Sequence, residues 1–291
     1  MKHELNIWVV GGDQRQARLA QLLSQDGHTV YTYALDLAQD LSGPIPRQTP
    51  AQIDLADCVI LPLPVSQGDG AMLNTPLSSS DHPLEDILDR LSPGQFLCGG
   101  RVEPQVHALA QARGLAIRDY FAREELAVAN AVPTAEGAVQ LAMEHLPITI
   151  HGARVLVLGF GRVGKLTAQR FQALGARVSV AARKYDQLAW AQAMGLGAEH
   201  LEQLGGCLCG YDLIVNTVPA QVLGRKELED VKEDCLILDL ASKPGGVDLG
   251  AAGELGLTVI WCLSLPGKVA PVTAGAAIQH TIYNMLHESG Y

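Results

Sequence analysis

The sequence predicts an α/β protein of two doubly wound domains that are joined by helices. Two strand-glycine-helix-strand patterns carry this prediction, one in residues 5–33 and one in residues 150–184. The third observation is a helix predicted over 273–287, which follows the last predicted strand, 258–262. We expect this C-terminal helix to cross back to the first domain. Both strand-helix-strand patterns are Rossmann-like.

Length, composition and charge limit the classes of protein that the chain can belong to. Its 291 residues are enough for two domains, and 48% hydrophobic with 18% charged residues is typical of a globular protein. A net charge of −10 argues against a nucleic-acid partner, although a local cationic pocket can still bind a small anion. We expect no membrane span, because no apolar run approaches the required length. The six cysteines show no zinc spacing, so we expect no metal site and a reducing cytoplasm.

The clearest motif is a G-x-G-x-x-G sequence between an apolar strand, 155–158, and a predicted helix. Gly159 permits the tight turn, Gly161 lets backbone N–H groups approach a pyrophosphate, and Gly164 lets the helix pack against the strand. The alternative is a glycine-rich turn in another kind of α/β domain. The predicted cofactor contacts in this loop are Gly159, Phe160, Gly161, Arg162, Val163 and Gly164.

The end of the following strand indicates which dinucleotide binds. NAD-specific domains usually carry Asp or Glu there, whereas this chain continues as Ala182-Arg183-Lys184. Two cations suit a 2′-phosphate, so NADP(H) is favoured over NAD(H). The alternative is that both cations belong to a solvated loop. Ligands bind at the carboxyl ends of parallel strands, so further cofactor contacts are predicted at Thr217, Val218, Pro219, Asp239, Ala241 and Ser242.

The segment 122–146 is predicted to be mostly helical and to link the two domains. Pro133 is expected to break it, so that a new helix covers 134–144. The predicted domains are residues 1–125, a substrate domain completed by the C-terminal helix 272–291, and residues 126–271, an NADP-binding domain.

Several motifs together resemble those of the A subunit of bacterial dipicolinate synthase. They lie in order along the whole chain, at 11–15 (GGDQR), 130–137 (NAVPTAEG), 150–152 (IHG), 158–162 (LGFGR), 238–246 (LDLASKPGG) and 265–271 (LPGKVAP). One departure is Val272, where a basic residue is expected in many relatives. The resemblance implies oxidation of dihydrodipicolinate, or of its hydroxylated precursor, to dipicolinate with NADP(H) in a sporulating bacterium. It also implies a partner, the flavoprotein-like B subunit of dipicolinate synthase, together with a homo- and hetero-oligomer and a place in the mother-cell cytoplasm.

A dicarboxylate substrate needs hydrogen-bond donors, and the candidates are Arg15, Ser66, Arg101 and Thr134. Formation of an aromatic ring asks mainly for positioning, but loss of water from a hydroxylated precursor requires an acid or a base. The catalytic candidates are Asp13, Glu136 and Lys268. Asp13 has an alternative role as a helix cap, and Glu136 has one as a first-turn acid that complements the helix dipole.

Two other functions remain open at this point. The chain could be a different two-domain NADP-dependent dehydrogenase, although it has no His near the strand 258–262, where hydroxyacid dehydrogenases need one. It could also be a nucleotide sensor without catalytic activity. Polar loops at the strand ends of both halves favour an enzyme with a two-sided site over a sensor.

Overall fold

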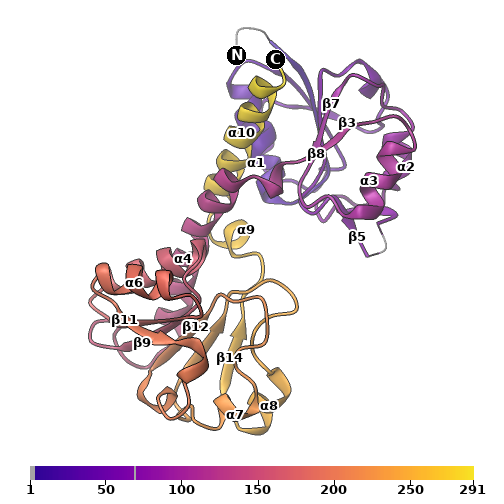
Figure 1. Cartoon of the computed structure of the whole chain (residues 1–291). Coiled ribbons are helices and arrows are strands. Elements are labelled where there is room, and N and C mark those ends of the chain that lie inside the picture. The colour runs from indigo at the N-terminus through magenta and orange to yellow at the C-terminus, as the bar shows by residue number, and fades with distance from the viewer. Residues whose placement is uncertain (1–3, 69) are drawn as a thin grey trace. The chain divides into compact units, whose positions relative to one another are not determined.

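The computed structural model describes residues 4–68 and 70–291. The chain forms two compact units, Met1–Asn130 with Ala270–Tyr291, and Ala131–Val269 (Figure 1). Each unit carries a six-stranded parallel sheet with helices, so the predicted fold class of two doubly wound α/β domains is confirmed. No helix within the described residues is long and apolar enough to cross a membrane.

The first unit has the strand order β3-β2-β1-β4-β7-β8. In that order, the strands are Ile45–Arg47, Thr29–Tyr33, Asn6–Val10, Cys58–Ile60, Phe96–Gly99 and Ile117–Asp119. Its helices are α1 (Gln14–Gln25), α2 (Leu84–Leu88), α3 (Pro104–Gln111) and α10 (Pro271–Glu288), and β5 (Ser66–Gln67) pairs with β6 (Met72–Leu73) in a hairpin. The chain direction across the sheet reverses between β1 and β4. Such a switch point is where ligands bind in open α/β sheets.

The C-terminal helix belongs to the first unit, as predicted. Helix α10 lies along α1 (Figure 1), and Gly275 is packed so closely that an added Cβ would come within 2.9 Å of the Arg15 carbonyl oxygen. Ile278, Ile282 and Leu286 recur every four residues and are buried in the core that α10 shares with α1. An ion pair between Arg123 and Glu288, at 2.7 Å, ties the end of α10 to the segment before α4.

The second unit has the strand order β11-β10-β9-β12-β13-β14. In that order, the strands are Gly197–His200, Arg177–Ala182, Arg154–Leu158, Leu213–Asn216, Leu236–Asp239 and Thr258–Trp261. Its helices are α5 (Arg162–Ala173), α6 (Tyr185–Ala193), α7 (Arg225–Leu228), α8 (Leu249–Glu254) and α9 (Leu265–Val269). The order reverses between β9 and β12, so the glycine fingerprint after β9 lies at the switch point.

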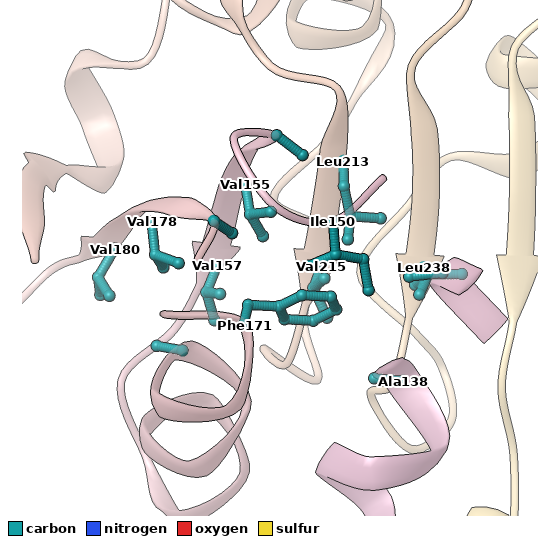
Figure 2. Packing of buried hydrophobic residues seen from close by; sticks show 14 of the residues in the cluster. Ala138, Ile150, Val155, Val157, Phe171, Val178, Val180, Leu213, Val215 and Leu238 are labelled. Carbon is teal, nitrogen blue, oxygen red and sulfur yellow. The ribbon is translucent and has the colours of Figure 1, made fainter. Parts of the chain in front are cut away.

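Both faces of the second sheet are covered, which explains why its strands are apolar throughout. Alternate residues such as Val155, Val157 and Val215 point to one face, where they meet Phe171 of α5 and Ala138 of α4 (Figure 2). The intervening Leu156, Leu158 and Ile214 belong to a separate core on the other face.

Two local predictions are wrong. Helix α4 runs without interruption from Glu124 to His145, with Pro133 inside it. A proline there forgoes one backbone hydrogen bond at a cost of about 3 kcal/mol. Burial of a stripe of small residues on this helix offsets that cost, namely Ala131, Ala135, Ala138 and Ala142. The segment expected to be a loop, 265–271, instead contains α9, because Leu265 and Val269 pack on Gly137.

Candidate functional site

The three fingerprint glycines have three different environments. Gly159 has φ +91°, which forms the turn after β9. A Cβ at Gly164 would lie 2.2 Å from the Gly159 carbonyl oxygen, so only glycine lets α5 approach the turn this closely. A Cβ at Gly161 would meet nothing within 4 Å, so the backbone at the start of α5 is open. Open N–H groups at a helix N-terminus are the groups that bind a pyrophosphate.

The side chains in this loop contribute unequally. Phe160 is 1% exposed and belongs to the core of the second unit, so only its backbone can face a ligand. Arg162 is exposed, and Val163 is half-buried in the first turn of α5.

The end of β10 fits a phosphate better than a ribose hydroxyl. Ala182 is buried, and the exposed Arg183 and Lys184 follow it with no carboxylate between them and the strand. Neither cation lies within ion-pair distance of an acidic side chain in the described part of the chain. Their charges are therefore free to attract an anion.

The loop after β12 is held next to the fingerprint. The hydroxyl of Thr217 donates to the Leu158 carbonyl oxygen at 2.8 Å. The side-chain amide of Asn216 closes a turn around Val218, because its Oδ1 accepts from the Val218 N–H and its Nδ2 donates to the Val218 carbonyl oxygen, both at 3.0 Å. Pro219 follows as an exposed residue. These bonds preorganise the loop at the switch point.

Asp239 has an internal role rather than a direct cofactor contact. Its carboxylate is 1% exposed and accepts from Asn216 Nδ2 at 2.8 Å, the Ala241 N–H at 3.0 Å and the Gly246 N–H at 2.8 Å. The prediction that this residue binds the cofactor is therefore corrected: the carboxylate positions the loop after β13. In that loop Ala241 is buried, whereas Ser242 is exposed.

In the first unit, Asp13 and Arg15 form a paired site at the switch point. Asp13 caps α1 by accepting from the Arg15 N–H at 3.0 Å, so the helix-cap alternative is confirmed. Arg15 donates to the same carboxylate through Nε at 3.0 Å and Nη2 at 2.8 Å, and Nη2 also donates to the Leu63 carbonyl oxygen at 3.1 Å. The guanidinium thus bridges the ends of β1 and β4, while its Nη1 has no hydrogen-bond acceptor among the described residues.

Arg101 projects from the end of β7 in an unusual backbone conformation. Its φ of +54° is rare for a residue with a side chain and costs about 1–3 kcal/mol. Asp119, at the end of β8, holds this conformation because its carboxylate accepts from the N–H groups of Arg101 and Val102, both at 2.9 Å. The Arg101 side chain is exposed, whereas Ser66 on β5 is buried.

The remaining predicted residues lie in the second unit. Glu136 is exposed on α4, and its Oε1 is 3.9 Å from Nε of Arg170 on α5. Arg170 lies about 12 Å along α5 from the residue after the fingerprint turn, given a rise of about 1.5 Å per residue. Glu136 therefore faces the body of the helix rather than the strand-end loops, and the prediction of a catalytic carboxylate at this position is wrong. Thr134 is half-buried on α4, and Lys268 is half-buried on α9.

Lys268 is close to the end of β14. Burial raises the pKa of the Cys262 thiol to about 11, and the positive charge of Lys268 opposes this effect. The ammonium group therefore lies near the carboxyl edge of the second sheet.

Four residues that shape these loops were not predicted: Asn216, Asp119, Tyr185 and His200. The first two act on backbone groups, and the last two lie beside Arg183. A polar side chain at the last position of a strand is the signal that indicates Asp119, Asn216 and His200.

Comparison with known proteins identifies the family. The A subunit of dipicolinate synthase from Bacillus subtilis (strain 168) is 34% identical over 289 residues, which cover 98% of this chain and 96% of that protein. The chain belongs to the family of dipicolinate synthase A subunits. The family model for the N-terminal domain of these A subunits matches residues 6–121. The model for the NAD-binding domain of D-isomer specific 2-hydroxyacid dehydrogenases matches residues 121–242.

Solved structures of dipicolinate synthase A subunits have the same fold. The Bacillus halodurans structure superposes with a TM-score of 0.90 at 30% identity, covering 98% of this chain and 99% of that one. The Bacillus subtilis structure gives a TM-score of 0.89 at 33% identity, with 99% and 97% covered. The dehydrogenase-type domain supports a nicotinamide dinucleotide cofactor and oxidoreductase activity.

Proposed function

We propose that the chain oxidises dihydrodipicolinate, or its hydroxylated precursor, to dipicolinate with NADP+ during spore formation. The observation that carries the proposal is the carboxyl edge of the second sheet. There the open backbone at Gly161 lies on the same edge as Arg183 and Lys184, with no acid at the end of β10. This arrangement fits a pyrophosphate together with a 2′-phosphate.

NADP+ supplies the hydride acceptor, and the residues of this chain supply binding and orientation. Oxidation of the dihydropyridine forms an aromatic ring, so the chemical step is downhill and depends mainly on positioning. We assign a substrate carboxylate to Nη1 of Arg15, because the other guanidinium nitrogens are held by Asp13 and Leu63. A guanidinium that is fixed on one side presents its remaining N–H donors in a defined direction.

Lys268 is the proton donor that we favour if water must leave the hydroxylated precursor. Asp13 is engaged by Arg15, and Glu136 lies beside Arg170, which leaves the Lys268 ammonium as the remaining catalytic candidate. Ser66, Arg101 and Thr134 are further proposed substrate contacts.

The Bacillus subtilis relative carries the name of one lettered part of a synthase, which implies that a second part exists. We propose that the second part is a flavoprotein-like B subunit, in an assembly with more than one copy of each chain. We place this assembly in the cytoplasm of the mother cell.

A coupled assay tests the proposal. Dihydrodipicolinate synthase and its substrates are supplied with NADP+ or NAD+, with and without the B subunit, and dipicolinate and reduced cofactor are followed. We expect dipicolinate, with NADP+ preferred. Formation of product only with the B subunit present would make this chain one half of an enzyme. Tight binding of NADP+ without product under any of these conditions would refute the synthase proposal and favour a sensor.

A further inference from the structure

An imidazole lies next to the cations at the end of β10. His200 is the last residue of β11 and is paired in register with Ala182, the last residue of β10 (Figure 1). Its Nε2 lies 3.1 Å from the carbonyl oxygen of Arg183, and the Glu202 N–H donates to its Nδ1 at 3.4 Å. A carbonyl oxygen can only accept, so Nε2 carries the proton. The neutral ring thus joins the residue after β10 to the turn after β11.

The orientation of the His200 ring is fixed from a third direction by Tyr185. The two rings lie 5.3 Å apart between centroids with an angle of 32° between their planes. Tyr185 is the first residue of α6 and is 76% exposed, so this pair forms the surface of the unit at this edge. Hydrophobic burial of Tyr185 does not explain the pairing, because most of that side chain remains in water.

The residue that His200 anchors is the first of the two cations after β10. Arg183 is exposed and has no acidic partner among the described residues, so its guanidinium has no ion pair that fixes it from the side-chain end. A guanidinium binds a phosphate best through two parallel N–H donors, and this geometry depends on where its backbone is held. The bond from Nε2 to the Arg183 carbonyl oxygen holds that backbone.

We propose that His200 is a positioning residue for recognition of the 2′-phosphate of NADP(H), acting through Arg183. This inference rests on the proposed use of NADP. It predicts that loss of the His200 hydrogen bonds weakens binding of the 2′-phosphate while binding of the rest of the adenosine moiety is kept.

Two fragments of the cofactor isolate that effect. Adenosine 2′,5′-bisphosphate carries the 2′-phosphate, and adenosine 5′-monophosphate lacks it, so isothermal titration of each against the full chain measures phosphate recognition without turnover. His200→Phe keeps a ring against Tyr185 but loses both hydrogen bonds, whereas His200→Gln keeps an amide donor near the position of Nε2. Arg183→Met is the control that removes the guanidinium itself, and thermal unfolding checks that each variant is folded.

We expect the unmodified chain to bind the bisphosphate at least about tenfold more tightly than the monophosphate. His200→Phe should lose roughly 5- to 10-fold in affinity for the bisphosphate, as expected for one hydrogen bond and its geometric effect, with the monophosphate unchanged. His200→Gln should recover most of this loss. Equal weakening of both fragments in a folded His200→Phe variant, or no weakening of either, would overturn the positioning role and leave the use of NADP intact. If the unmodified chain does not prefer the bisphosphate, and Arg183→Met changes nothing, the use of NADP itself is refuted.

Discussion

The two glycines on either side of the start of α5 provide the sharpest test of the cofactor site. Gly161→Ala places a methyl group in open space, where no atom lies within 4 Å. Its φ of −81° suits any residue, so the main folding cost is the poorer helix cap, about 0.5–1 kcal/mol. At roughly 2–4 °C per kcal/mol, the melting temperature should fall by no more than about 4 °C. The same methyl group should obstruct the pyrophosphate and weaken NADP+ binding by at least about tenfold.

Gly164→Ala should behave differently, because its Cβ would lie 2.2 Å from a backbone oxygen that cannot rotate away. Such overpacking costs about 1–3 kcal/mol, and the gain in helix propensity offsets at most about 1 kcal/mol. This variant should therefore lose both stability and cofactor affinity. Gly253→Ala is a matched control in α8, where a Cβ also meets nothing within 4 Å. It should change neither.

The assay is thermal unfolding together with titration of NADP+ and NADPH. If Gly161→Ala binds both nucleotides with unchanged affinity, the open backbone at this position is not the pyrophosphate site. If Gly164→Ala is as stable as the unmodified chain, the close approach of α5 to the turn does not contribute to stability as argued.

Four other perturbations test separate parts of the structure. Arg15→Lys should raise the KM for substrate by about tenfold or more without changing the KM for NADP+, because an ammonium cannot bridge two partners and still present fixed donors; an unchanged substrate KM in steady-state kinetics would contradict the assignment. Asp239→Asn should lower the free energy of unfolding in urea by about 1–3 kcal/mol, because a buried N–H would face an amide instead of an oxygen, and full stability would argue against its role. The hydrogen bond from Arg123 lowers the pKa of Glu288. That pair should therefore stabilise the fold above the unfolded pKa of about 4.3 and lose its effect as the pH falls further. Glu288→Gln should flatten the fall in melting temperature between about pH 5 and pH 3, and an identical pH profile would exclude this contribution. Iodoacetamide at pH 8 should label the two exposed thiols well before the four buried ones, and peptide mass spectrometry should find modification first at Cys207 and Cys209 and last at Cys58, Cys98, Cys235 and Cys262.

The sequence was informative wherever the physical constraint is local. The fingerprint glycines, the buried strands and the cap at Asp13 depend on residues a few positions apart, and each was visible in the pattern of apolar, glycine and polar residues. The missing acid after β10 was visible in the same way.

The predictions that were wrong or incomplete concern partners distant in the sequence. Pro133 would end an isolated helix, but burial of the alanines around it keeps α4 continuous. Asp239 and Glu136 are similar as carboxylates in a sequence, yet one is buried against three donors and the other is exposed beside Arg170. Which oxygen meets which N–H is decided by tertiary packing, and no local pattern reports it.

The place of α10 has a consequence for the order in which the chain can fold on the ribosome. The first unit is discontinuous, because Ala270–Tyr291 returns to it after the whole of Ala131–Val269 has been made. Until then the face of α1 that meets Ile278, Ile282 and Leu286 has no partner. The second unit is continuous and can close its core as soon as it emerges. We therefore expect the N-terminal unit, although synthesised first, to be the last to complete its core, which reverses the usual vectorial order.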